Sequence, residues 1–363
     1  MSKQFKAFYK EWCQYEFVNN GATPTLFFHL ALTGKFFNGL KFDPDSLKEY
    51  RIQAAKRCSE MLGNRPALCL SGGVDSQAMI QCWQEAGLEF DVAILVFDNG
   101  LNQQDVDHAR LYCSVNNITP IEIPLNISAF LITDNYNYGL RYKCSSPHFN
   151  THYKLFNILR EMGYTGVCAG GTYPHVQAGV WANPLSVASM NFIEYSRIND
   201  YPAMGNFLGF SPELAWTLGM LSFNDPVVPL ENSALHRATV SLEERNQLYS
   251  IRYADKIAAM TRHGFNVIPQ SQKFTGFELV KEHFAKKAKG DGWAFERNFR
   301  HPLEELFPEC GPSIMTMPDS TKKTMDKLRR NQMLTCGEAR PGITDQVSSS
   351  HNRPRKSYTS CNP

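Results

Sequence analysis

Short apolar runs alternate with longer segments of helical periodicity between residues 60 and 175. Continuous apolar strands separated by helices are typical of a parallel sheet that is covered on both faces. The pattern therefore predicts an α/β fold with a doubly wound parallel sheet. The expected strands lie at 67–70, 90–97, 120–125 and 166–169, and the expected helices at 76–86, 102–116 and 150–162.

The segments that flank this block have a different pattern. Residues 3–62 carry aromatic and aliphatic side chains at helical spacing, with a second helical run at 46–62, and predict an N-terminal helical layer. After residue 205 strands are hard to find, and the pattern predicts a C-terminal helical region that includes a helix at 277–289. The expected domains are the helical layer at 1–62, the α/β domain at 63–204, a helical substrate domain at 205–317 and a polar, disordered tail at 318–363.

The composition is that of a globular chain. Of its 363 residues 43% are hydrophobic and 20% are charged, which excludes a mainly disordered, collagen-like or coiled-coil protein. No apolar run reaches the roughly 20 residues that a membrane-spanning helix needs, and the first residues lack the apolar core of a signal peptide. The ten cysteines form no CxxC pair and are too dilute for a disulfide scaffold. We therefore expect a cytoplasmic protein with reduced thiols and no membrane partner.

The formal net charge of +2 hides an uneven distribution along the chain. The tail at 318–363 carries nine Lys or Arg against four Asp or Glu, whereas the rest of the chain is mildly acidic. A basic tail can dock RNA, DNA or an acidic partner protein. A solvated tail without a partner explains the same charge equally well.

A glycine-rich motif stands between the first apolar run and the helix that follows it. Its residues are Ser71, Gly72, Gly73, Val74, Asp75 and Ser76. Adjacent glycines let the backbone turn sharply and approach a ligand without obstruction by a Cβ atom, and the N-terminus of a helix attracts anions. The serine hydroxyls can add donors, and the aspartate can hold the Mg²⁺ that neutralises a polyphosphate. The motif predicts a phosphate-binding loop; a turn that only caps the helix is the alternative.

The sequence SGGVDS in this strand–turn–helix setting resembles the PP-loop of the N-type ATP pyrophosphatases, the adenine nucleotide alpha-hydrolase-like superfamily. These include asparagine, GMP and NAD synthetases, 7-cyano-7-deazaguanine synthase, thiouridylases and, more distantly, phosphosulfate reductases. The resemblance covers residues 60–175 and implies ATP and Mg²⁺ as cofactors, with the β,γ-pyrophosphate of ATP on the loop. It also implies cleavage of ATP between the α and β phosphates, adenylation of a carboxyl, amide or carbonyl oxygen, and displacement of AMP by a nucleophile.

The resemblance implies positions for the rest of the nucleotide as well. The adenine would rest at the end of the second strand, where Phe97 fits a core position better than an adenine contact and Asp98 is the better candidate. The fourth strand ends in Gly170 and Gly171, where many members place glycines and an acidic residue. No Asp or Glu follows here, so the second Mg²⁺ ligand stays open. His175 could act as a base, and a structural histidine is the simpler interpretation.

Nitrogen is the first of two nucleophiles that the resemblance allows. Asparagine and GMP synthetases carry a glutaminase domain, but residue 2 of this chain is Ser instead of Cys, and the N-terminal layer is too short for such a domain. Ammonia would then come from solution, from a separate donor protein or from an amine of the substrate. The expected activity is that of an amide-forming ligase acting on a small-molecule or nucleobase-type substrate.

Sulfur is the second possible nucleophile. Lys143 and Cys144 lie between the third and fourth strands, in a stretch that resembles a cysteine-containing segment of phosphosulfate reductases and thiouridylases. Neighbouring cations would favour a thiolate at Cys144, and a sulfur donor protein would then be the partner; an inert thiol is the simpler interpretation. In either case Lys143 is the preferred cation for a phosphate contact. Lys273 and Arg300 are candidate contacts to an anionic group of the substrate.

A non-catalytic adenine-nucleotide-binding protein is a third interpretation, from a different functional class. The intact SGGVDS argues against it, because loss of catalysis would first release the serine and the aspartate from constraint. The sequence leaves the oligomeric state open.

Overall fold

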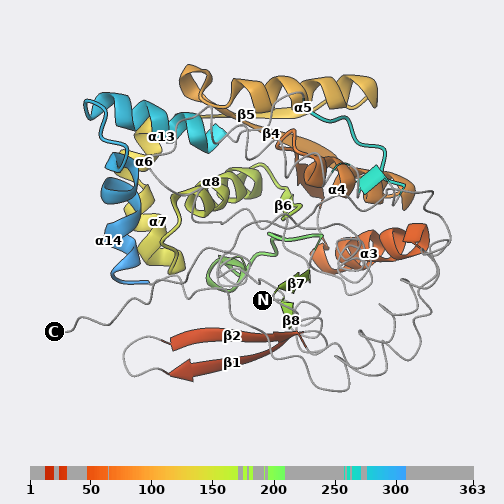
Figure 1. The fold of residues 1–363 in the computed structure, drawn as a ribbon. Helices are drawn as coiled ribbons and strands as arrows, with labels where there is room; N and C mark the ends of the chain where they lie inside the picture. Colours follow the sequence, from red (N-terminus) through yellow and green to blue (C-terminus); the bar gives the residue numbers. More distant parts are fainter. Residues whose placement is uncertain are drawn as a thin grey trace, which may run out of the picture.

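The computed structural model describes the backbone of the strands within 13–30 and 175–182, together with residues 47–63, 65–170, 192, 195–208, 257, 260–261, 264–270 and 276–307. The central feature of this part of the chain is a parallel β-sheet with helices on both faces (Figure 1). Among the residues described, no helix is long and apolar enough to cross a membrane.

Four strands form the sheet. They are β3 (Pro66–Cys69), β4 (Asp91–Phe97), β5 (Ile121–Leu125) and β6 (Thr165–Cys168). Their order across the sheet is β5-β4-β3-β6, and every pairing is parallel. The predicted parallel sheet is therefore confirmed, and the strands lie close to their expected positions.

The connections between the strands supply the covering helices. They are α4 (Val74–Glu85) from β3 to β4, α5 (Gln103–Val115) from β4 to β5, and α6 (Ile127–Thr133), α7 (Asn135–Tyr142) and α8 (Pro147–Glu161) from β5 to β6. Because parallel crossovers are right-handed, α4 and α5 lie on one face, and the return path from β5 to β6 places α8 on the other. The three helices expected between the strands are confirmed as α4, α5 and α8. The short helices α6 and α7 were not predicted.

The strand order reverses beside β3, and this reversal locates the candidate site. The chain moves outward from β3 to β5 and then returns to β6 on the opposite side of β3. Ligands of open α/β sheets bind at such a switch point, outside the carboxyl ends of the strands. The glycine-rich motif follows β3 and Gly170 follows β6, so both glycine turns flank this point.

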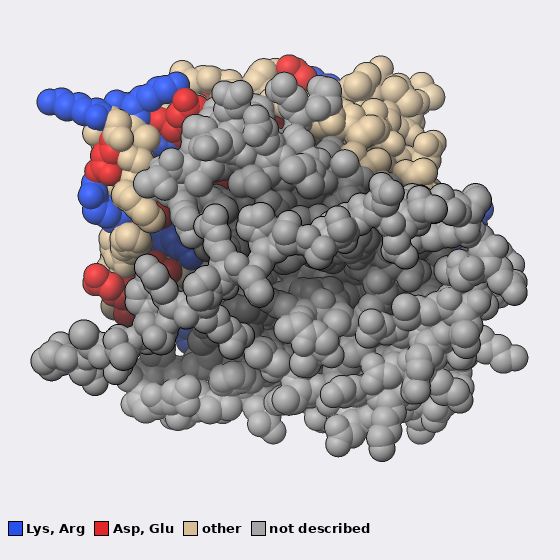
Figure 2. Space-filling model, in the orientation of Figure 1, with Lys and Arg blue, Asp and Glu red and all other residues tan. Residues whose placement is uncertain are grey.

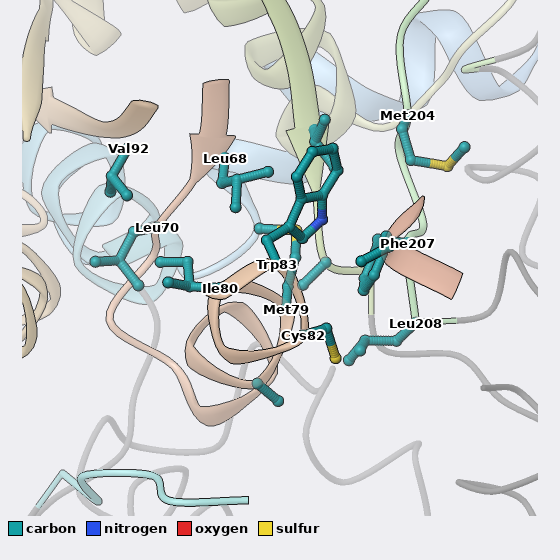
Figure 3. Close-up of a cluster of buried hydrophobic side chains, with 14 of the residues drawn as sticks. Leu68, Leu70, Met79, Ile80, Cys82, Trp83, Val92, Met204, Phe207 and Leu208 are labelled. Atoms are coloured by element: carbon teal, nitrogen blue, oxygen red, sulfur yellow. The ribbon is translucent and has the colours of Figure 1, made fainter. Parts of the chain in front are cut away.

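Successive residues of the strands pack on opposite faces of the sheet. Leu68 and Val92 belong to a cluster that is completed by Trp83 of α4 and Phe207. Figure 3 shows Leu68 and Phe207 near the indole of Trp83, with Val92 farther away beside Leu70. Ala67, Cys69 and Ala93 point to the other face and pack in the cluster around α8. With both faces buried, the sheet is a rigid base for the turns at its edge.

A third apolar cluster lies at the carboxyl ends of β4 and β5. Its rings include Phe97 and Phe277, whose centroids are 5.9 Å apart. Phe277 belongs to α13, which confirms the expected C-terminal helix. The C-terminal elements are α13 (Gly276–Lys287), the π-helical turn η3 (Glu296–Arg300) and α14 (His301–Glu304).

The N-terminal helical prediction is wrong at two segments. Residues 3–62 include an antiparallel pair, β1 (Cys13–Asn19) and β2 (Pro24–Leu30), and the helix described in this stretch is α3 (Leu47–Leu62). Aromatic and β-branched residues favour strands at least as well as helices. Asn20-Gly21, between the two segments, is a turn signal that the helical interpretation overlooked.

Other parts of the sequence prediction are not tested. Most of the helical substrate domain expected at 205–317 and the whole of the tail at 318–363 lie outside the described residues. A short antiparallel pair, β7 (His175–Gln177) and β8 (Val180–Ala182), was not predicted. The domain boundaries therefore stay predictions.

Candidate nucleotide-binding site

The turn between β3 and α4 has the backbone geometry that the motif predicted. Gly72 has a φ of +76°, in the left-handed region that favours glycine. A Cβ atom at this position would lie 2.5 Å from the backbone oxygen of Asp105, so a side chain would also collide with the first turn of α5. Gly73 is the N-cap of α4 and brings no side chain to the cap. The N–H groups of a first helical turn have no partner within the helix, and such groups can bind an anionic ligand.

The two serines of the motif differ in their environment. Ser76 is buried, and its hydroxyl donates to the Gly73 carbonyl oxygen at 2.8 Å. The Ser76 hydroxyl oxygen also accepts from the Ser71 backbone N–H at 3.3 Å. Ser71 itself is exposed. Ser76 therefore holds the turn closed, and the Ser71 hydroxyl is the one placed for contact with a ligand.

Asp75 lies in the first turn of α4 and is partly buried. A carboxylate is stabilised at the N-terminus of a helix. Mg²⁺ is usually held by one or two carboxylates together with substrate phosphates and waters, so one aspartate beside a phosphate-binding turn fits this ion. Within the described residues no group of three His, Cys, Asp or Glu could hold a metal by itself.

The end of β4 is organised by hydrogen bonds that the sequence did not reveal. The side chain of Asn102 accepts from the Phe97 N–H at 2.8 Å and donates to the Leu95 carbonyl at 2.7 Å. Asp98, the preferred adenine candidate, accepts from the backbone N–H of Ile127 at 2.7 Å and from the Asn99 side chain at 2.7 Å. The carboxylate of Asp98 thus fixes the start of α6. Phe97 is buried, as expected for a core residue of the strand.

The turn after β6 is also shaped around glycine. Gly170 has a φ of +70°, and a Cβ atom there would overlap the side chain of Asn206. Gly171 and the side chain of His175 lie outside the described residues, so their predicted roles stay predictions. Gly170 is thus required by the backbone conformation and by the packing of Asn206, and its predicted contact with the nucleotide stays a prediction.

The segment of Lys143 and Cys144 has two different surfaces. Lys143 is exposed and adopts a φ of +52° at the C-cap of α7. Cys144 is 2% exposed and belongs to the α8-side cluster with Tyr142 and Tyr153. A nucleophilic thiolate needs a polar, accessible setting. The burial of Cys144 therefore disfavours the sulfur hypothesis, whereas Lys143 keeps the exposure that a phosphate contact requires.

Basic side chains at the corner formed by α13 and α14 are interspersed with acidic ones, as Figure 2 shows. Arg300 pairs with Glu304 at 3.4 Å, and Lys286 pairs with Glu282 at 3.0 Å. Lys273 lies outside the described residues. Because Arg300 is held in an ion pair of its own helix turn, a contact between Arg300 and substrate would have to compete with Glu304.

A histidine pair at the same edge of the sheet was missed. His148 and His152 lie one turn apart on α8, with ring centroids 4.5 Å apart, and His148 also contacts the ring of Phe277 at 4.7 Å. Burial lowers the pKa of His152 to about 4. Desolvation of the imidazole, followed by the charges of His152 and Lys281, lowers the pKa of His148 well below 6.5, although the residue as a whole is exposed. The i,i+4 spacing was the sequence signal for this neutral pair.

No family model matches the chain, and no curated protein matches it. Among solved structures, NMN synthetase from Francisella tularensis is similar over 35% of this chain and 54% of that one, with 20% sequence identity and a TM-score of 0.28. The similar part thus spans little more than half of NMN synthetase. A likeness of this extent carries no argument about activity, so the functional interpretation rests on the residues of the site.

Proposed function

We propose that the protein is an ATP-dependent, AMP- and pyrophosphate-forming enzyme of the synthetase type. The observation that carries the proposal is the turn between β3 and α4 at the switch point of the sheet. There Gly72 takes a left-handed conformation and Gly73 caps the helix without a side chain. Such a turn presents backbone N–H groups to a polyphosphate.

The proposed reaction has two steps. A carboxyl, amide or carbonyl oxygen of a small-molecule or nucleobase-type substrate attacks the α-phosphorus of ATP, and the bond to the β,γ-pyrophosphate breaks. A nitrogen nucleophile then attacks the adenylated carbon, the C–O bond to AMP breaks, and the nitrogen loses a proton. The nitrogen comes from solution, from a donor protein or from the substrate.

The proposal assigns a role to each of four groups of the chain. The first-turn N–H groups of α4 and the Ser71 hydroxyl would hold the pyrophosphate, and Asp75 would hold the Mg²⁺ that neutralises it. Lys143 supplies a further cation for the α-phosphate. Catalysis of this kind depends chiefly on holding the two reactants in line and on stabilising the transferring charge.

ATP–pyrophosphate exchange with candidate substrates tests the proposal, with Asp75→Asn as the variant. We expect exchange to fall by about 10²-fold, the usual order for removal of one electrostatic contact to a transition state. Asp107→Asn is the matched control, since Asp107 is an exposed aspartate of α5 that pairs with Arg110. Equal exchange in wild type and Asp75→Asn would contradict the enzymatic proposal. Mg-ATP binding without exchange for any substrate would favour the non-catalytic interpretation.

The basic tail supports a separate proposal about a binding partner. We propose that the tail at 318–363 docks an acidic partner or a nucleic acid. Its nine Lys or Arg against four Asp or Glu give it a net positive charge, whereas the rest of the chain is net negative. Deletion of residues 318–363 should then reduce retention on an anionic matrix at low salt while leaving exchange intact. Retention of the truncated chain at the same salt concentration as the full chain would contradict a docking role.

A further inference from the structure

A buried glutamine joins the candidate nucleotide-binding turn to a segment far along the chain. Gln77 is fully buried in the second turn of α4. Its side-chain N–H group donates to the Gly72 carbonyl at 3.1 Å and to the Ile268 carbonyl at 2.9 Å. Its side-chain oxygen accepts from the Ile268 N–H at 2.7 Å. One amide thus satisfies both backbone groups of Ile268 and one backbone group of the turn.

The segment that Gln77 contacts runs along α4, and we call residues 264–270 the strap. Gln81, one helical turn after Gln77, accepts from the Asn266 N–H at 2.7 Å and donates to the Gly264 carbonyl at 3.2 Å. The side chain of His108 from α5 bonds the Ile268 carbonyl at 2.7 Å. Two glutamines on one face of α4 therefore hold the strap through its backbone.

The strap ends against the back of the turn. The side chain of Gln270 donates to the Asp105 carboxylate at 3.1 Å. The position that a Cβ atom would take on Gly72 lies 3.2 Å from the Gln270 side-chain nitrogen. The strap, the first turn of α5 and the glycine turn are thus in direct contact.

The geometry points to Gln77 as a positioning residue for the nucleotide-binding turn, an inference that rests on the proposed function for its consequence. The peptide unit between Gly72 and Gly73 is planar, and its C=O and N–H groups point in opposite directions. By holding the Gly72 oxygen, Gln77 fixes the Gly73 N–H on the side away from itself. The turn's donors are therefore set before ATP arrives, and their orientation depends on contacts with the strap.

Gln81→Met provides a matched control for Gln77→Met. Both changes put methionine in place of a glutamine of similar length. Gln77→Met removes the hydrogen bonds to Ile268, and Gln81→Met removes those to Gly264 and Asn266 of the strap and to Glu85 of α4. Only Gln77→Met also removes the bond to the Gly72 carbonyl. A difference between the two variants at the turn thus reports the contact with Gly72 and not the loosening of the strap.

Two measurements on the full chain decide the inference: hydrogen exchange of the peptides that contain residues 70–74 and 264–270, and the Kd of Mg-ATP. Gln77→Met should speed exchange of the turn and weaken Mg-ATP binding by about tenfold, as loss of one net hydrogen bond implies. Gln81→Met should speed exchange of the strap and leave the turn within about twofold of wild type. Equal effects of the two variants on the turn, or an unchanged turn in Gln77→Met, would overturn the inference.

A second variant covers the case in which Gln77→Met does not fold. Gln77→Asn keeps a neutral amide in this fully buried site and is one methylene shorter, so it should release the Gly72 carbonyl without burying a charge. The exchange measurement also separates this inference from the proposed function. If the wild type binds no Mg-ATP but the turn responds to Gln77 alone, the positioning role stands and the proposed function fails.

Discussion

Two regions at the same edge of the sheet are built on opposite principles. At the end of β3 the surroundings of the turn are hydroxyls and amides, and Ser76 and Gln77 bond its backbone directly. Between α7 and β6 the surroundings are rings. Tyr142, Tyr153 and Tyr195 pack with centroids 4.9–5.6 Å apart. The first region presents backbone polarity to a ligand, whereas the second encloses its polar atoms in a core.

The difference explains why the two candidate chemistries fare differently. Phosphate binding by a glycine-rich turn relies on backbone N–H groups, which need only the correct turn, and glycine at 72 permits that turn. A cysteine nucleophile relies on one side chain and its access to solvent. Cys144 follows a helix whose C-terminal Tyr142 is fully buried, and it is buried with that residue. The phosphate-binding hypothesis, which depends on backbone groups, therefore agrees with the structure better than the sulfur hypothesis, which depends on one accessible side chain.

Among the variants considered, Gly72→Ala should have the largest effect on the region of the turn. The change places a Cβ atom in a left-handed conformation and 2.5 Å from the Asp105 backbone oxygen. We expect loss of Mg-ATP binding and a fall of about 2–4 kcal/mol in the free energy of unfolding. Isothermal titration and urea denaturation measure the two effects.

Gly63→Ala separates the two causes, because Gly63 has a φ of +66° and nothing within 4 Å of the added Cβ atom. This control should lose only about 1 kcal/mol, the cost of the left-handed conformation, and should leave ATP binding intact. If Gly72→Ala were no more destabilising than Gly63→Ala and still bound ATP, the close packing of the turn against α5 would have no functional consequence.

The sequence predicted the elements that carry their own local signals. The apolar runs predicted the strands, and the adjacent Gly72 and Gly73 predicted the turn at the edge of the sheet. The helix α6 was missed although Asn126 is a readable cap, whose side chain accepts from the Ala129 N–H at 2.8 Å. By contrast, no pattern in the sequence could join Gln77 to Ile268, 191 residues away, because that contact is set by tertiary packing.

The histidine pair on α8 lies in the tyrosine-rich region and should make the free energy of unfolding depend on pH. The pKa of His152 is about 4 in the folded chain against about 6.5 in the unfolded chain. Below pH 6.5 the unfolded chain therefore binds a proton on this imidazole, whereas the folded chain does not. The free energy of unfolding falls as the pH drops from about 6.5 to about 4. The expected loss is about 2–3 kcal/mol.

Urea denaturation of wild type and His152→Phe across this pH window measures the effect. The variant keeps a ring beside Phe192, with which the imidazole stacks at 6.3 Å, and removes the titrating group. The wild-type slope should therefore be reduced in His152→Phe and unchanged in His301→Phe, since His301 is exposed on α14. Parallel slopes for wild type and His152→Phe would show that burial does not depress this pKa.

Cys144→Ser has the smallest expected effect and gives the sharpest test of the second region. The thiol lies 3.8 Å from the Ser146 carbonyl among buried tyrosines, so a hydroxyl of similar size should fit with a loss of about 1 kcal/mol in the free energy of unfolding. ATP–pyrophosphate exchange should stay at the wild-type rate, because the proposed reaction uses no thiol. Cys113→Ser is the control, a buried cysteine of α5 whose pKa burial raises to about 11. Loss of exchange in Cys144→Ser alone, with both variants folded, would restore the sulfur hypothesis and place a reactive group inside what the structure shows as a packed aromatic core.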